Sequence, residues 1–168
     1  GKAYVFNGSA QGVSATPTTT IQGTGTGYFG YSVSAQGSVL GDATVDLAVT
    51  APLLNGSTGT TYFFDGDDIA ASGAYTTSSP NVVTLAGAVQ SSGQMGFRIT
   101  VGNVVGTSKK DLIVNHGTTQ GTYWWYIYEG ANALNAQATV TLPIPGTTPR
   151  FKYANQQSSC DLNGDGYE

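Results

Sequence analysis

Three stretches of this sequence resemble one another and recur at intervals of about 60 residues. They are rich in aromatic residues, and each closes on a glycine: Gly1–Gly8, Gly59–Gly66 and Thr122–Gly130. The closing glycines are 58 and 64 residues apart. A repeat of this length, too short to bury its own apolar face, predicts an architecture in which successive units pack against one another.

A second element recurs with the same interval. Phe29–Ala35 and Met95–Val101 both place a large apolar residue before a glycine and continue with alternating apolar and polar residues. Phe151–Tyr153 is a shorter third copy. The alternation is typical of half-buried β-strands.

A turn follows each copy of the second element. The turns are Ser38–Asp46, Asn103–Asp111 and Asp161–Glu168, and the first two lead into the apolar strands Leu47–Val49 and Leu112–Val114. Each unit therefore contains about four short strands, which is the size of one blade of a β-propeller.

The composition agrees with an all-β fold. The 168 residues include 24 Gly and only 10% charged residues, and Tyr, Thr, Val and Phe recur in short runs between Gly, Asn, Asp and Ser. We expect β-propeller blades, each a four-stranded antiparallel sheet, because a two-sheet sandwich has no reason for a 60-residue repeat.

The repeat also predicts the boundaries of a single propeller segment. They are an outer half-blade at 1–26, blades at 27–92 and 93–147, and the start of another blade at 148–168. These are about three blade equivalents with split half-blades at the two ends, fewer than the four to eight that close a ring. We expect a piece of a longer propeller, or several chains joined, either as two chains with six blades or as a filament.

The third turn has the pattern of a calcium loop. Asp161, Asn163 and Asp165 occupy alternate positions, Gly166 follows directly, and the backbone carbonyl of Tyr167 stands at the seventh position. Oxygen ligands in this order suit Ca²⁺, which takes six to eight of them.

These motifs resemble the FG-GAP repeat, the blade of the integrin α-subunit propeller. Phe29-Gly30 matches the FG, Thr50-Ala51-Pro52 stands where Gly-Ala-Pro is usual, and the third turn resembles the calcium turn between the first two strands of a blade. The resemblance implies an Asp at the ninth position of the turn, which Asp46 and Asp111 occupy.

Under this resemblance the first two turns differ in their ligands. The first offers the carboxylates of Asp42 and Asp46 to a cation, and Leu40 stands where a third ligand is expected. The second contains Lys109 and Lys110, so we expect no ion there and a charge substitution by the lysines instead.

A composition rich in Ser, Thr and Gly and poor in Lys, the calcium loop and two glycosylation sequons favour an extracellular setting. The net charge is −4 and the basic residues do not cluster, which argues against nucleic acid as a partner. No apolar run is long enough to span a membrane. Asn7 and Asn55 begin glycosylation sequons. The single Cys160 is expected to be a buried thiol or to pair outside these residues.

No catalytic constellation is found in the sequence, so an enzyme is not expected. His116 has no His or Cys companion at metal spacing. The acidic cluster of Asp65, Asp67 and Asp68 follows an aromatic strand and favours a solvated turn over an acid–base pair. The aromatic run Tyr123–Tyr128 favours core packing over a sugar site, because alternate residues of a strand face opposite ways.

The function expected from the sequence is a calcium-stabilised extracellular propeller module for binding or adhesion, with a protein or glycan ligand. Two alternatives stay open. One is a structural subunit of a filament or surface assembly, in which neighbouring chains complete the half-blades. The other is a carbohydrate-binding lectin.

Overall fold

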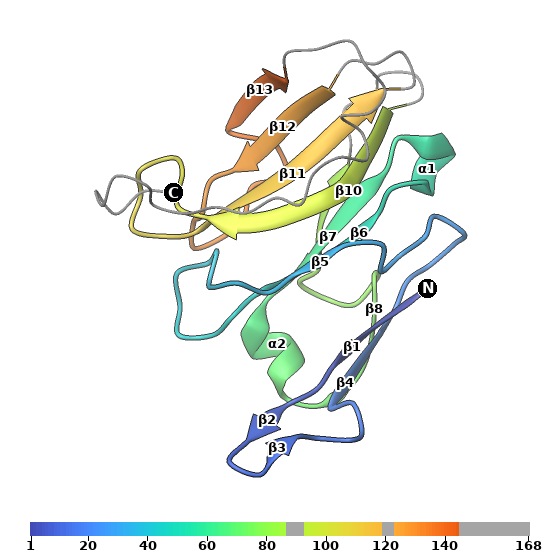
Figure 1. Cartoon of the computed structure of the whole chain (residues 1–168), viewed down its shortest axis with the longest axis vertical. Coiled ribbons are helices and arrows are strands. Elements are labelled where there is room, and N and C mark those ends of the chain that lie inside the picture. The colour runs from blue at the N-terminus through green and yellow to red at the C-terminus, as the bar shows by residue number, and fades with distance from the viewer. Residues whose placement is uncertain (87–92, 119–122, 145–168) are drawn as a thin grey trace.

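The computed structural model describes residues 1–86, 93–118 and 123–144, and this part of the chain is all-β, as predicted (Figure 1). Three sheets succeed one another along the molecule. The first sheet has the strand order β1-β4-β8, with bounds β1 Lys2–Val5, β4 Thr19–Gln22 and β8 Gly73–Thr76. Near it lies a small hairpin of β2 (Gly8–Ser9) and β3 (Gly12–Val13).

The second and third sheets are the two four-stranded antiparallel sheets. The second has the order β5-β6-β7-β9, with bounds β5 Val33–Ser34, β6 Leu47–Ala51, β7 Thr60–Phe64 and β9 Val83–Ala86. The third has the order β10-β11-β12-β13, with bounds β10 Gly93–Gly102, β11 Asp111–Thr118, β12 Tyr123–Tyr128 and β13 Val140–Ile144. Two short helical turns, α1 (Leu54–Ser57) and α2 (Gly66–Ala70), flank β7.

The two four-stranded sheets repeat the same strand register. Leu47 lies opposite Phe64 in the second sheet, and Leu112 lies opposite Tyr128 in the third. The first strands agree as well, since β5 and β10 pair with β6 and β11 at equivalent positions. The 60-residue repeat of the sequence is therefore a repeat of whole antiparallel sheets.

Two apolar clusters fill the spaces between the sheets. One contains Ala48, Phe63 and Leu85 together with residues of β10 and β11, and so lies between the second and third sheets. The other contains Tyr62 and Phe64 with residues of β1 and β4, and so lies between the first and second. Because strand residues alternate between faces, β7 sends adjacent aromatic side chains into different cores.

The residues of the FG-like element occupy equivalent places in both repeats. Phe29 and Met95 are buried, and the glycines that follow them, Gly30 and Gly96, have φ of 89° and 91°. A side chain is strained at such φ, which explains why glycine recurs there.

One strand, β8, does not pair within the sheet formed by its neighbours in the sequence. β8 lies within the stretch 27–92 expected to form one blade, yet it pairs in parallel with β4 of the first sheet. Thr19 Oγ1 also donates to the Ile69 carbonyl oxygen at 2.7 Å. The excursion through α2 and β8 thus fastens the second sheet to the first.

Candidate functional site

A buried carboxylate organises the first turn, which joins β5 and β6. Asp46 is 1% exposed, and its Oδ2 accepts backbone N–H groups of Val39 at 2.7 Å and Leu40 at 3.0 Å. Its Oδ1 accepts the N–H of Gly66, just after β7, at 3.0 Å. One side chain thereby holds the turn closed and fixes it to the end of the third strand.

The second turn, between β10 and β11, repeats this arrangement around Asp111. The carboxylate is fully buried, and its Oδ2 accepts the N–H groups of Val104 and Val105 at 2.8 and 2.9 Å. Its Oδ1 accepts the N–H of Gly130 at 3.0 Å, just after β12. The ninth residue of each turn therefore has the same structural task.

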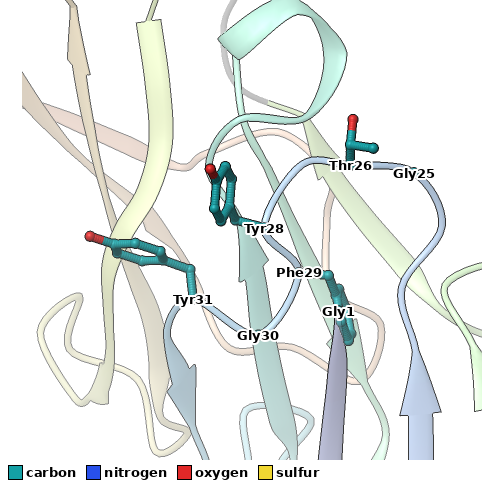
Figure 2. A pocket seen from close by; sticks show the side chains of 7 residues that line it. All are labelled: Gly1, Gly25, Thr26, Tyr28, Phe29, Gly30 and Tyr31. Atoms are coloured by element: carbon teal, nitrogen blue, oxygen red, sulfur yellow. The ribbon is translucent and has the colours of Figure 1, made fainter.

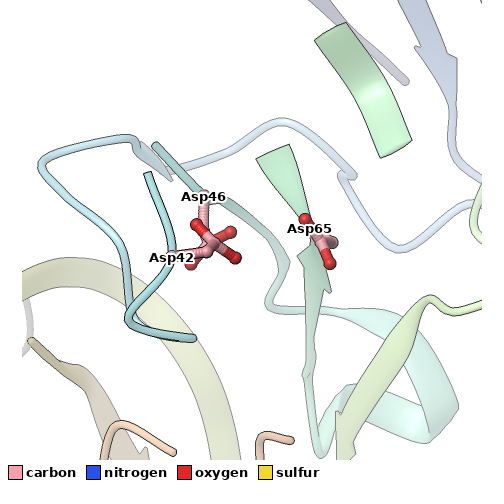
Figure 3. A group of neighbouring side chains, drawn as sticks. All are labelled: Asp42, Asp46 and Asp65. Carbon is pink, nitrogen blue, oxygen red and sulfur yellow. The ribbon is translucent and has the colours of Figure 1, made fainter. Parts of the chain in front are cut away.

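Three carboxylates meet at the first turn. Asp42, Asp46 and Asp65 each place an oxygen within 4.8 Å of the others (Figure 3). Asp42 comes from the middle of the turn, Asp46 from its end, and Asp65 from the junction of β7 and α2. This acidic triad is the strongest candidate for a metal site among the described residues.

Hydrogen bonds shape the triad. Asp42 Oδ1 accepts the N–H and hydroxyl of Thr44 at 3.0 and 2.9 Å, and the Ser38 hydroxyl at 3.0 Å. Asp65 Oδ1 accepts the Asp67 N–H at 2.8 Å and so caps α2. These bonds favour the ionised carboxylates.

The titration of the triad reflects its crowding. The N–H and hydroxyl of Thr44 lower the pKa of Asp42 below its ordinary value. Burial raises the pKa of Asp65, and the charges of Asp46 and Asp42 raise it further. The hydrogen bond from the Asp67 N–H acts in the opposite direction and lowers it, but burial is the larger effect. Negative charge therefore accumulates here at a cost that a cation would relieve.

The donor set fits a hard divalent cation. A carboxylate offers about four acceptor sites, and the hydrogen bonds above leave each of the three groups with acceptor capacity. All three are oxygen donors, the type that Ca²⁺ and Mg²⁺ take. Three side chains are fewer than the six to eight ligands of Ca²⁺, so backbone carbonyls or water have to supply the rest.

The second turn has no such triad. Thr107 and Glu129 stand at the positions of Asp42 and Asp65 in the register of the two sheets. The Lys109 ammonium donates to the Leu40 carbonyl oxygen of the first turn at 2.8 Å and to Asn132 Oδ1. The lysine thus links the two turns through the third position of the first.

The predicted site residues divide into three groups. Asp161, Asn163, Asp165 and Tyr167 lie outside the described residues, as does Cys160. Asp42 and Asp46 do lie together, and Asp65 joins them, although the sequence favoured a solvated turn for it. The pairing of Leu47 with Phe64 places Asp46 beside Asp65, so knowledge of that register would have revealed the third carboxylate.

The remaining predicted positions are less distinctive. Asn7 and Asn55, which begin the two sequons, are both exposed, and Asn55 Nδ2 donates to Thr60 Oγ1 at 3.1 Å. In the aromatic run, Tyr123, Ile127 and Tyr128 are buried, in keeping with core packing.

His116 is fully buried at the end of β11. Its ring packs against Trp124 and Tyr126, and neither ring nitrogen has a hydrogen-bond partner among the described residues. Burial lowers its pKa to about 4. The imidazole is therefore neutral at physiological pH.

A shallow pocket of about 360 Å³ lies beside the FG-like element of the first repeat. Tyr28 and Tyr31 project at its rim, as Figure 2 shows, while Phe29 between them points into the protein. Tyr28 has a φ of 61°, in the left-handed region that aromatic residues rarely adopt. The strained backbone presents an exposed aromatic ring.

Comparisons with protein-family models and with curated proteins found no match. Among the described residues, no helix is long and apolar enough to cross a membrane.

Proposed function

We propose that this chain is a segment of a calcium-stabilised β-propeller of the FG-GAP type, which acts outside the cell as a binding or adhesion module without catalysis. Its two four-stranded antiparallel sheets share one register and pack face to face with one apolar core between them. That is how blades of a propeller pack. The only histidine is neutral and buried, which supports a role without catalysis.

The observation that carries the calcium role is the acidic triad of Asp42, Asp46 and Asp65. It lies where the turn between the first two strands meets the end of the third. A bound Ca²⁺ supplies positive charge there, which offsets the repulsion among the carboxylates and holds the turn to β7. Ion binding to the folded state alone stabilises the protein by mass action.

Thermal melting with Ca²⁺, with Mg²⁺ and with chelator tests this role. We expect Ca²⁺ to raise the melting temperature and the double variant Asp42→Asn/Asp65→Asn to lose most of that increase. A second pair, Asp161→Asn/Asp165→Asn, separates the contribution of the third turn. A melting temperature independent of Ca²⁺ in the unmodified chain would refute the proposal.

Carbohydrate binding is a second candidate function, supported by the exposed Tyr28 and Tyr31 at the pocket rim. Aromatic faces provide apolar contact area at such a site. A glycan array with the unmodified chain and Tyr28→Ala tests it. A glycan bound by the first and lost by the second supports a lectin, whereas equal binding excludes this pocket.

A further inference from the structure

The first strand of the chain is the counterpart of the third strand in each four-stranded sheet. Tyr4 on β1 lies opposite Thr20, just as Tyr62 on β7 lies opposite Thr84. Val5 also accepts the Thr18 N–H at 2.8 Å, as the equivalent residue of β12 accepts an N–H from the segment before β13. The pair β1-β4 therefore corresponds to β7-β9 and β12-β13.

In the first sheet the equivalent of this third strand, β1, has an open edge as far as the described residues go. β7 lies between β6 and β9, and β12 between β11 and β13, whereas β1 stands at the end of the order β1-β4-β8. Gly1 accepts the Gly23 N–H at 3.1 Å, so the backbone of Gly1 faces β4. By the alternation of an antiparallel ladder, the N–H and C=O of Tyr4 face the open edge.

The aromatic side chains of this first segment are also more exposed than their counterparts in the two four-stranded sheets. Phe6 is 46% exposed, whereas its counterparts Phe64 and Tyr128 are 2% and 3% exposed. Tyr4 is exposed as well, although its counterpart Tyr62 is buried. An aromatic strand with an open hydrogen-bonding edge is a template for pairing with another strand.

The neighbours of β7 and β12 define the chemistry of the strand that fits this edge. These neighbours are β6, which Asp46 immediately precedes, and β11, which begins at Asp111, and in both the Asp is followed by Leu. In both, the Asp carboxylate accepts the N–H of the glycine that follows the aromatic strand. Gly8 is the corresponding glycine of β1. Because the Ser14 N–H donates to the Asn7 carbonyl oxygen at 3.0 Å, alternation turns the Gly8 N–H away from β3.

We infer that β1 is the acceptor edge for an added strand of the type Asp-Leu-x-Val, whose Asp carboxylate accepts the Gly8 N–H. In these 168 residues the Asp-Leu-x-Val pattern occurs at Asp46–Val49 and Asp111–Val114 alone, in β6 and β11, which are already paired on both sides. The occupant is therefore a polypeptide segment outside these 168 residues that carries another repeat of this kind. The inference names a partner for the proposed module, but it depends on strand pairing alone and not on Ca²⁺ or glycan.

A synthetic peptide with the sequence of Gln36–Ala51, which contains the first turn and β6, is the probe. We expect calorimetric titration into the full chain to show binding in the presence of chelator. The same peptide with Asp46→Asn should bind about tenfold or more weakly, because a hydrogen bond to a charged group is lost.

Two variants of the protein locate the binding site. Gly8→Pro removes the N–H and should abolish binding, whereas Gly8→Ala keeps it and should bind as the unmodified chain does. An added Cβ at Gly8 meets no atom within 4 Å. Peptide binding should also protect the Tyr4 amide from hydrogen exchange, with the amides of β11 unchanged as a measure of intact folding.

Equal affinity of both peptides, or of both Gly8 variants, would overturn the inference. So would protection confined to β7, which would mean that the peptide replaces β6 in its own sheet. Self-association of the chain through β1 without binding of the peptide would assign the edge to a second copy instead, and would overturn it too. Failure here leaves the calcium test untouched.

Discussion

The turns at 38–46 and 103–111 are built around an equivalent buried carboxylate with equivalent backbone donors, and they differ in the charged side chains around it. Asp46 and Asp111 each accept two N–H groups of their own turn and one from the glycine beyond the third strand. Around Asp46 two more carboxylates gather. In the other turn Lys109 instead extends to the neighbouring repeat.

The resemblance to a calcium turn implies two roles for these residues, closing the turn and holding a cation. The comparison of the two turns separates these roles. The ninth residue closes the turn whether or not other carboxylates are present, since in both turns its two oxygens accept three backbone N–H groups. Under the proposed calcium role, the ability to hold a cation depends on the residue in the middle of the turn and on the one after β7. Structure and metal binding can therefore be lost independently.

The largest effect is expected from the shared carboxylate. Asp111→Asn replaces one acceptor oxygen by an NH₂ group facing buried N–H donors, and should cost about 3 kcal/mol of unfolding free energy. Asp46→Asn should cost a similar amount even without Ca²⁺. Urea denaturation measures both, with exposed Asp67→Asn as control. A large loss for Asp111 only would mean that the two turns are not built alike.

The next effect concerns His116, whose counterpart in the second sheet is Ala51. Its ordinary pKa of 6.5 falls to about 4 in the folded protein, so below pH 6.5 the unfolded chain binds a proton that the folded one excludes. Stability should be complete above pH 6.5 and fall by up to about 3 kcal/mol as pH drops to 4.

His116→Phe should remove this part of the pH dependence, and urea unfolding between pH 4 and 7 measures it. The groups that pack against the imidazole, Trp124 and Tyr126, carry no charge in this range, since burial raises the pKa of Tyr126. Carboxylates titrate equally in both proteins and cancel in the difference. Identical pH profiles would contradict the prediction.

Transferring the three candidate ligands of the first turn to the second tests which residues separate the two turns. Thr107→Asp with Glu129→Asp and Lys109→Thr places the triad in the second turn. We expect an additional Ca²⁺-dependent stabilisation, about 2.7 kcal/mol when free Ca²⁺ is 100-fold above Kd. The reverse exchange, Asp42→Thr with Asp65→Glu, should weaken the response of the first turn. Calcium titration by calorimetry counts the sites, and an unchanged count would argue against the triad as the binding unit.

The smallest effect is expected from the link between the turns. Lys109→Met keeps most of the stem that packs over Gly41 but removes the bond to the Leu40 carbonyl oxygen. The loss should be about 1 kcal/mol, because the ammonium is partly exposed. Lys2→Met, at an exposed position, serves as the control. Equal stability of the two variants would show that the link is not stabilising.

Much of the fold could be predicted from the repeat alone. The intervals between equivalent glycines predicted which segments form equivalent strands. Alternation favoured core packing for the aromatic run, although it did not say which of its residues are buried. The pairing of β8 with the first sheet could not be predicted from the sequence, because nothing in a four-residue strand specifies which strand it pairs with. Asp65 was likewise indistinguishable from a turn residue until strand pairing placed it beside Asp46.

By itself the sequence determined the periodic elements: which residues alternate, where glycine permits left-handed backbone, and which aspartate ends each turn. These are local properties, set by steric limits and by the chemistry of neighbouring residues. The tertiary structure alone decided which carboxylates meet, which lysine bridges two repeats and which aromatic strand has an open edge among the described residues. These features depend on contacts between residues far apart in the chain, which strand pairing within a sheet and the packing of neighbouring sheets bring together.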